Sequence, residues 1–316
     1  MTAVWWNPVL RRVGAQAARL VFVVFGVTSF LFLLSHLAGD PAELYAEPSA
    51  TPEMLEATRA RLGLDEPLAA QYWNALVSSF TFRFPPSYTF GGPVEGLVLG
   101  KLGLSLVLVG VSITLACVIA LALGVVGALY PTRLLGRAAL FVSYVTAAVP
   151  YFVLPLILIL LFSIRWRLLP AGGDTGLESY VIPVAALTFM GYATLSRLVR
   201  SELLDVFTRG YIETARSKGI SPWRVLALHG LPGAAPPVLA WVGIEFSYLF
   251  GALLVVEPLM NFNGIGSFLL NGVAQRDFPV VQTAIVSIAI LVTLVNGLID
   301  ITVTAIDPRT KTGAET

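Results

Sequence analysis

The chain has 316 residues, of which 56% are apolar and only 12% are charged. An average soluble domain carries about 25% charged residues. This composition therefore excludes a soluble globular enzyme, a disordered chain and a fibrous repeat, and it indicates an integral membrane protein. The 20 basic and 19 acidic residues nearly balance, unlike the basic excess of a nucleic-acid-binding protein. One cysteine and two histidines are too few for an internal disulfide or a metal cluster, so we expect no metal site and no nucleic-acid partner.

Long apolar stretches predict six membrane-spanning helices, since about 20 apolar residues cross the hydrocarbon core. We expect these helices at about residues 20–39, 102–130, 138–164, 180–199, 238–257 and 278–305. The fold class is therefore an all-α integral membrane protein. Pro150 and Pro155 lie within the third stretch and are expected to kink it. The first stretch is longer than a typical signal-peptide core and lacks a clear A-x-A cleavage site, so we interpret it as a retained helix.

The distribution of Lys and Arg predicts that both ends of the chain are cytoplasmic. With six spans, 13 of the 20 basic residues fall on the N-terminal side of the membrane and 7 on the other side. This topology gives a cytoplasmic segment at residues 1–19, an extracytoplasmic cap at 40–101, a cytoplasmic loop at 200–237 and a cytoplasmic tail at 311–316.

The extracytoplasmic cap is predicted to contain two short helices. Thr51 suits an N-cap and is followed by Pro52 and Glu53, which favour the first helical turn, and Gly63 suits the end of that helix. A second helix is expected after Pro67. The aromatic stretch at 80–93 predicts a loop. The cap is too short to be an independent domain.

The loop at 200–237 is predicted to form two short helices joined by a tight turn at Gly219. Ser221 is expected to cap the second helix, with Pro222 at its first position. The apolar residues of this loop fit either an ordinary solvated loop or a docking surface for another protein. These apolar residues are Ile212, Ala215, Ile220 and Trp223.

This loop also carries a resemblance to a known family. Glu213-x-Ala215, followed by Gly219 and then Ser221-Pro222, resembles the EAA signature of ABC-importer permeases, and 211–223 is similar to the dipeptide/oligopeptide/nickel branch. Further similar motifs occur in the same order along most of the chain. They are Gly39-Asp40-Pro41, residues 62–67, residues 276–282, and the ending formed by Asn296, Asp300 and Asp307-Pro308-Arg309. The chain departs from the branch at 80–92 and at 229–233.

The resemblance implies a type-I-like ABC importer permease fold, with a permease core at 102–310 following the small cap, in a bacterial inner membrane. It implies a transport subunit rather than an enzyme, working with a second homologous permease, two ATP-binding subunits or a fused ATPase, and a solute-binding protein. ATP and Mg would belong to those partners, because Gly100-Lys101 is followed by Leu102 and does not match a phosphate-binding loop. Short peptides are the implied substrate, with chelated nickel, glutathione or an oligosaccharide as alternatives.

The same resemblance assigns the coupling to the ATPase to seven residues of the cytoplasmic loop. They are Glu213, Thr214, Ala215, Arg216, Gly219, Ser221 and Pro222. Ionisable groups within membrane spans are candidates for function in their own right. Glu245, Glu257 and Asp300 are therefore candidates for the translocation path or its gate. For Glu245, protonation or a hydrogen bond to a neighbouring helix is equally open. Asn296, one turn before Asp300, favours a structural contact for Asp300. An intramembrane enzyme is a remote alternative, since it would require paired catalytic groups within the membrane.

Overall fold

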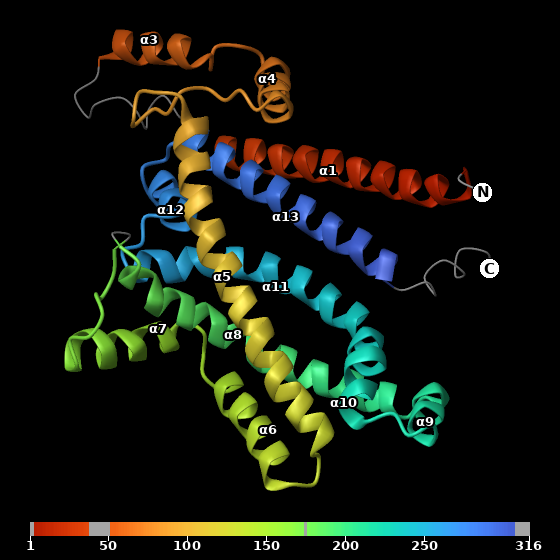
Figure 1. Ribbon diagram of the computed structural model, residues 1–316. Coiled ribbons are helices and arrows are strands. Elements are labelled where there is room, and N and C mark those ends of the chain that lie inside the picture. The colour runs from red at the N-terminus through yellow and green to blue at the C-terminus, as the bar shows by residue number, and fades with distance from the viewer. Residues whose placement is uncertain (1–2, 38–50, 174–175, 307–316) are drawn as a thin grey trace. The chain divides into compact units, whose positions relative to one another are not determined.

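The computed structural model describes residues 3–37, 51–173 and 176–306 (Figure 1), and within these ranges the regular structure is helical. The chain divides into two compact units. Unit 1 comprises residues 1–105 and 263–294, and unit 2 comprises 106–262 and 295–316. The motifs Gly39-Asp40-Pro41 and Asp307-Pro308-Arg309, and the tail at 311–316, lie outside the described residues.

Unit 1 contains helices from both ends of the chain. They are α1 (Ala3–Leu37), α3 (Pro52–Leu62), α4 (Leu68–Thr81), the first part of α5 (Val94–Leu129), α12 (Ile265–Ala274) and the first part of α13 (Phe278–Ile306). The predicted start and end of α3 are confirmed. The Met54 N–H donates to Thr51 Oγ1 at 3.4 Å, and Gly63 ends the helix with a φ of +68°.

Helix α4 packs against α1 and α13 through hydrogen bonds between polar side chains. Thr28 Oγ1 of α1 donates to Ser79 Oγ of α4 at 2.9 Å, and Ser29 Oγ lies 2.7 Å from Tyr72 Oη. Gln282 of α13 donates through Nε2 to the same Ser79 Oγ at 3.1 Å. The second helix of the cap is therefore part of the helix packing of unit 1.

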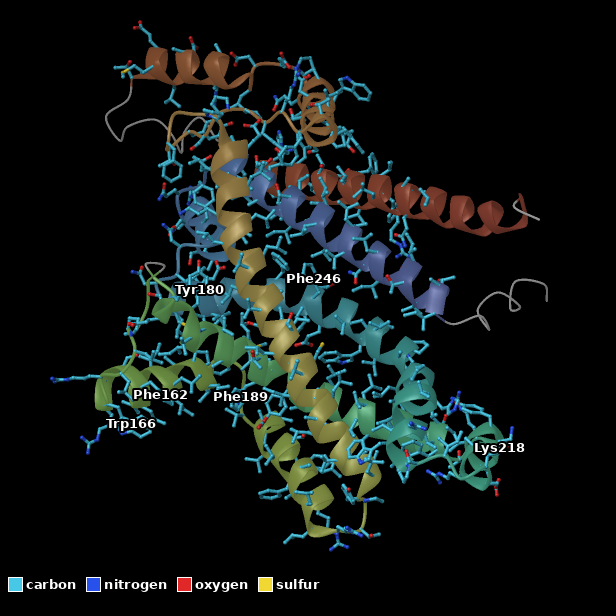
Figure 2. All side chains as sticks on the ribbon, viewed as in Figure 1. Phe162, Trp166, Tyr180, Phe189, Lys218 and Phe246 are labelled. Carbon is cyan, nitrogen blue, oxygen red and sulfur yellow. The ribbon has the colours of Figure 1, made fainter. Side chains whose placement is uncertain are left out.

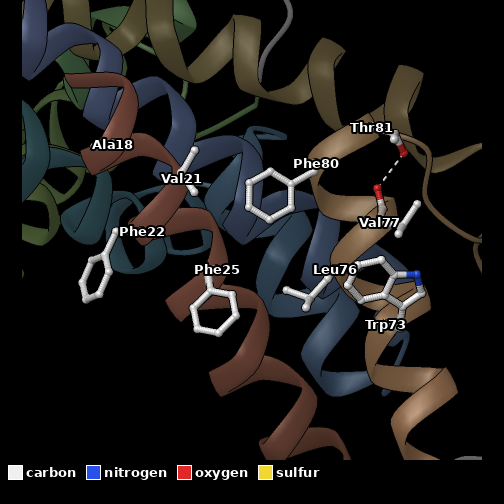
Figure 3. A pocket seen from close by; sticks show the side chains of 9 residues that line it. All are labelled: Ala18, Val21, Phe22, Phe25, Trp73, Leu76, Val77, Phe80 and Thr81. Atoms are coloured by element: carbon white, nitrogen blue, oxygen red, sulfur yellow. Dashed lines mark hydrogen bonds between the residues drawn. The ribbon is translucent and has the colours of Figure 1, made fainter. Parts of the chain in front are cut away.

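An apolar groove of about 790 Å³ follows the contact between α1 and α4 (Figure 3). Val21, Phe22 and Phe25 form part of one wall, and Trp73 and Phe80 part of the other. The hydroxyl of Thr81 is bonded to the Val77 carbonyl at 2.7 Å. The lining of the groove is thus almost entirely apolar, with the indole of Trp73 and the hydroxyl of Thr81 as its polar groups.

Unit 2 contains the middle of the chain. Its elements are the rest of α5, α6 (Leu134–Ala147), α7 (Val153–Leu158), the π-helix η1 (Ile159–Arg165), α8 (Glu178–Phe207), α9 (Gly210–Ser217), α10 (Pro222–Val225), the π-helix η2 (Leu226–Gly230), α11 (Leu231–Leu259) and the end of α13. Helices α5 and α8 approach closely because Gly124 has no side chain. A Cβ atom there would lie 2.6 Å from Val199 Cγ1. Small residues allow such close contact between membrane helices.

The prediction of one continuous helix at 138–164 is wrong. Helix α6 ends at Ala147, and α7 begins only at Val153. Pro150 lies in the break, where it has no N–H to continue the helix and restricts the residue before it. Within the described residues, five helices are long and apolar enough to cross a membrane, and their spanning segments are Val13–Leu37, Val94–Leu129, Glu178–Phe207, Pro222–Leu259 and Phe278–Ile306.

The broken segment is nevertheless held to α8 by two hydroxyl contacts. Ser143 Oγ lies 2.7 Å from Ser196 Oγ, and Thr146 Oγ1 lies 2.6 Å from Tyr192 Oη. Ser143 and Ser196 are fully buried, so α6 has a fixed register against α8 although it is only 14 residues long.

Candidate functional site

Helix α9 buries one face within its own chain. Ile212 is 0% exposed and Ala215 is 5% exposed, and both pack in a cluster with Val206, Val225 and Ala234. The expectation that these apolar residues are exposed in the loop is therefore wrong for Ile212 and Ala215. The spacing of three residues gives a short helix one apolar stripe, and unit 2 itself covers that stripe. Of the other two apolar residues named in this loop, Ile220 is partly buried and Trp223 is exposed, at 64%.

The opposite face of α9 is polar and exposed. It carries Glu213, Thr214, Arg216 and Ser217, and Lys218 follows at the end of the helix (Figure 2). The structure thus places most of the predicted coupling residues on an accessible surface but turns Ala215 inward. A partner that binds here meets charged and hydroxyl groups. The buried face instead ties α9 to α8, α10 and α11.

The turn after α9 depends on Gly219, whose φ is +75°. In this left-handed conformation, the Gly219 N–H donates to the Arg216 carbonyl at 2.9 Å. Residues with a Cβ atom adopt this conformation at a cost of about 1–2 kcal/mol. Ser221 then occupies the N-cap position of α10 and Pro222 its first position, but the Ser221 side chain makes no capping hydrogen bond.

The start of α9 is tied to α8 by an ion pair. Arg209 Nη2 lies 2.9 Å from Asp205 Oδ2. The hydrogen bond that the Arg209 guanidinium donates to Asp205 raises the pKa of that guanidinium further above its ordinary value. The pair is partly exposed, so it contributes at most about 1 kcal/mol. Its main effect is to fix where the guanidinium lies.

Glu245 lies in the packing between α11 and α8. It is 8% exposed, and among the described residues its Oε1 atom has no hydrogen-bond partner. A Cβ atom on Gly191 of α8 would lie 3.1 Å from that oxygen. Gly191 therefore leaves the space that the carboxyl occupies. The possible hydrogen bond to a neighbouring helix is not formed by Oε1.

The other two candidate pathway residues have different surroundings. Glu257 is fully buried near the end of α11, whereas Asp300 is exposed on α13. Asn296, one turn before Asp300, donates through Nδ2 to Ser247 Oγ of α11 at 2.9 Å. The structure thus brings Glu245 and Glu257 onto one helix, and α13 contacts α11 through Asn296.

A buried carboxylate that sequence reasoning missed holds the loop before α5. Asp277 is 1% exposed and precedes the first residue of α13. Its Oδ2 accepts hydrogen bonds from Ser87 Oγ at 2.5 Å and from the Thr89 N–H at 3.0 Å. Its Oδ1 accepts from the Val280 N–H at 3.3 Å. An aspartate just before Phe-Pro is a typical N-cap signal and was the available clue.

Tyr88, between the two residues that bind Asp277, reports the closed surroundings of this loop. Burial, together with the nearby Asp277 carboxylate, raises the pKa of the Tyr88 phenol to about 12. We call the hydrogen-bonded group of Ser87, Thr89, Asp277 and Val280 the Asp277 clasp. It closes the predicted loop at 80–93 onto the start of α13.

Comparison with known proteins gives consistent matches along the chain. The family model described as binding-protein-dependent transport system inner membrane component matches residues 113–312, and the model of the N-terminal part of such components matches 7–90. The probable peptide ABC transporter permease protein y4tP of Sinorhizobium fredii (strain NBRC 101917 / NGR234) is 34% identical over 96% of this chain and 98% of its own. The glutathione transport system permease protein GsiC of Escherichia coli (strain K12) is 32% identical over 92% of this chain and 96% of its own.

Solved structures show a similar fold at lower identity. A chain of the MetNI methionine ABC transporter in an inward-facing conformation matches with a TM-score of 0.57 and 23% identity. The match covers 67% of this chain and 96% of that chain. At this level of identity the likeness concerns the fold alone.

Proposed function

The chain belongs to the family of binding-protein-dependent transport system inner membrane components, and on that premise we propose that the exposed face of α9 binds an ATP-hydrolysing subunit. The protein is a permease subunit of an ABC importer, with the all-helical type-I permease fold and no ATPase site of its own. An intramembrane enzyme is therefore set aside. The import of a hydrophilic solute against its gradient requires energy, which separate subunits that bind ATP and Mg would supply.

The packing of α9 is the observation that supports this coupling role. Its apolar face is buried against α8 and α11, and its polar face is exposed. A partner that moves the polar face therefore moves two spanning helices with it, as a rigid body. In this arrangement Glu213, Thr214, Arg216 and Gly219 contact or shape the docking surface, with Ser221 and Pro222 beyond the turn. Ala215 acts from inside, by holding α9 to the core.

Charge reversal on the docking surface tests this proposal. Glu213→Arg combined with Lys218→Glu should reduce copurification of the ATPase subunits and the stimulation of ATP turnover by substrate by at least about tenfold. Glu56→Arg, an exposed glutamate on α3, is the matched control and should leave both unchanged. Full copurification and stimulation in the double variant would overturn the assignment.

We further propose that the imported solute is a short peptide delivered by a solute-binding protein, and that the path is shared with a second homologous permease. One similar protein carries peptide and another glutathione in its name, and glutathione is itself a tripeptide. Chelated nickel and oligosaccharides remain the competing substrates. Copurification of a solute-binding protein with the transporter complex, followed by mass spectrometry of its bound ligand, separates these classes.

Within the path, Glu245 is the acidic residue with the most support, because its Oε1 atom is buried and has no hydrogen-bond partner in the part of the chain that the structure describes. A displacement of α8 from α11 would open this oxygen to the solute, and a carboxylate there would suit a peptide ammonium group. We assign Glu257 to the gate near the end of α11 and Asp300 to the path or its rim. The proposal predicts that Glu245→Gln lowers peptide uptake more than Asp300→Asn does.

The proposed topology places the protein in a bacterial inner membrane with both ends in the cytoplasm. It predicts that Lys218 and Glu56, an exposed residue of α3, lie on opposite sides. Single-cysteine variants Lys218→Cys and Glu56→Cys, each in a Cys117→Ser background, test this with a membrane-impermeant maleimide. In whole cells only Glu56→Cys should react. Reaction of Lys218→Cys in intact cells would invert the topology.

A further inference from the structure

A polar cavity of about 400 Å³ lies in unit 2 where α8, α9, η2 and the start of α11 meet. Its polar lining residues are Glu202, Arg209, Tyr211 and His229, and four residues at the start of α11 line it as well, together with Leu228 and with Ile306 at the end of α13. We propose that this cavity binds a small zwitterion, a molecule with one free ammonium and one free carboxylate group and the size of an amino acid or a dipeptide. This inference rests on the proposed function for its link to the transported solute.

The charged side chains of the cavity have opposite signs and are not paired with each other. Arg209 binds Asp205 through Nη2. It also interacts with the Tyr211 side chain through a hydrogen bond. A guanidinium has five N–H donors, so these contacts fix its position and leave further donors for a carboxylate ligand. Glu202 lies on α8 five residues before its end at Phe207, which is a rise of about 7.5 Å, and Arg209 follows two residues later as the N-cap residue of α9. A dipeptide spans about 7 Å between its ends, so side chains that reach inward from this separation fit its two charges.

The backbone at the start of α11 adds acceptors for an ammonium group. Pro236 and Pro237 have no N–H, so the carbonyls of Pro232 and Gly233 lack the donors that a regular helix supplies. Pro232 and Gly233 both line the cavity. Carbonyls without a helical N–H donor favour a cation with several N–H donors. The ammonium end of the ligand is therefore assigned to Glu202 and this turn of α11.

The aromatic wall keeps the cavity open and offers donors for the carboxylate end. The Tyr211 and His229 rings lie 6.4 Å apart between centroids, at 66°. Gly233 faces Tyr211, and a Cβ atom there would lie 3.0 Å from the Tyr211 hydroxyl. His229 belongs to η2, and π-helical turns occur frequently at functional sites. A larger residue at 233 would fill the cavity from the α11 side.

This combination of groups discriminates between classes of ligand. A phosphate or another multivalent anion would be repelled by Glu202, and a polyamine would be repelled by Arg209. A neutral sugar would leave both charges without partners. A zwitterion satisfies both ends at once. A peptide importer releases molecules of this class, and the cavity borders α9, so an occupied site would contact the helix that we assign to ATPase docking.

Equilibrium binding of radiolabelled alanyl-alanine to the purified transporter complex in lipid nanodiscs, without ATP, tests the proposal. The wild type should bind it saturably. N-acetyl-alanyl-alanine and alanyl-alanine amide, which each lack one charge, should compete at least about tenfold less well. Glu202→Gln should weaken binding about tenfold, and Gly233→Val should abolish it. Arg224→Gln, an exposed arginine outside the cavity, is the matched control and should bind like the wild type.

Several outcomes would overturn the proposal. These are the absence of saturable binding by the wild type, equal binding by the blocked dipeptides, or unchanged binding by both Glu202→Gln and Gly233→Val. Binding that is lost only in Glu245→Gln would place the ligand elsewhere and also overturn it. Substrate-stimulated ATP turnover, measured on the same samples, reports on the proposed transport function separately. If turnover persists while the cavity variants bind normally, this inference alone fails.

Discussion

Asp277 in unit 1 and Glu245 in unit 2 are both almost fully buried, at 1% and 8% exposure, but their carboxyl groups have opposite surroundings. Asp277 accepts hydrogen bonds from Ser87, Thr89 and Val280. Glu245 has one oxygen with no hydrogen bond among the described residues and lies instead against Gly191.

The difference indicates that a buried acidic residue can have either a structural or a functional role. A carboxylate that accepts several hydrogen bonds holds a structure together, because its removal leaves donors without partners. A buried carboxyl that lacks such bonds adds little to stability, so its presence within a membrane span points to function. The two residues should therefore respond differently to the same kind of substitution.

The largest expected effect is on the Asp277 clasp. Asp277→Ala removes the acceptor of three hydrogen bonds and should lower the free energy of unfolding by about 3 kcal/mol. Trypsin cleavage after Arg83, which begins the adjacent loop, should become faster in the same variant. Thermal unfolding and limited proteolysis in detergent measure the two effects. Asp65→Ala, an exposed aspartate in the same unit, should change neither, and equal effects of the two substitutions would contradict the role of the clasp.

Ser87→Ala should have an intermediate effect. It removes the hydroxyl that donates to Asp277 and that accepts from the Phe90 N–H at 2.8 Å. The Thr89 and Val280 bonds to Asp277 remain, so a loss of about 1–2 kcal/mol is expected. Thermal unfolding measures it. A loss as large as that of Asp277→Ala would show that Ser87, and not the carboxylate, organises the loop.

Titration of Tyr88 tests whether the loop held by Asp277 is closed. Its pKa of about 12 lies above the ordinary value of 10, so the folded state favours the neutral phenol. The associated stability is fully present below pH 10 and is lost as the pH rises through 12. The difference in absorbance at 295 nm between wild type and Tyr88→Phe should titrate with a midpoint near 12. A midpoint near 10 would mean that the loop is open.

The smallest effect on stability is expected for Glu245→Gln. No hydrogen bond to Oε1 is lost, so the free energy of unfolding should change by less than about 1 kcal/mol. Peptide uptake in reconstituted vesicles should nevertheless fall clearly if Glu245 lines the path. A stability loss similar to that of Asp277→Ala would remove the distinction between the two acids, and normal uptake would remove Glu245 from the path.

Local patterns in the sequence predicted local features well. Thr51 and Gly63 set the ends of α3, and the apolar stretches indicated where membrane helices occur. Pro150 predicted a kink, but the size of the interruption depends on how α6 packs against α8. Whether the apolar stripe of α9 faces a partner or its own chain could not be predicted, because the spacing of Ile212 and Ala215 is the same in both cases.

Local sequence patterns did not predict contacts between residues that are far apart in the chain. Ser87 and Asp277 are 190 positions apart, and neither segment contains a pattern that predicts their hydrogen bond. The polar cavity likewise depends on α8, η2 and α11 meeting at one place. The Asn296–Ser247 bond joins residues 49 positions apart. The sequence shows which of these residues can form hydrogen bonds, but their partners depend on the three-dimensional fold.

The length of helix α8 determines how far its end would move if the helix tilted. Its 30 residues measure about 45 Å, which exceeds the hydrocarbon thickness of about 30 Å even at a usual tilt of about 20°. Pro183 lies near its start, about 36 Å from the end at Phe207. A pivot of only 5° at Pro183 would carry that end about 3 Å sideways. With such a pivot the helix would act as a lever arm and would convert a slight opening at one face of the membrane into a displacement of α9 as large as an atomic contact distance.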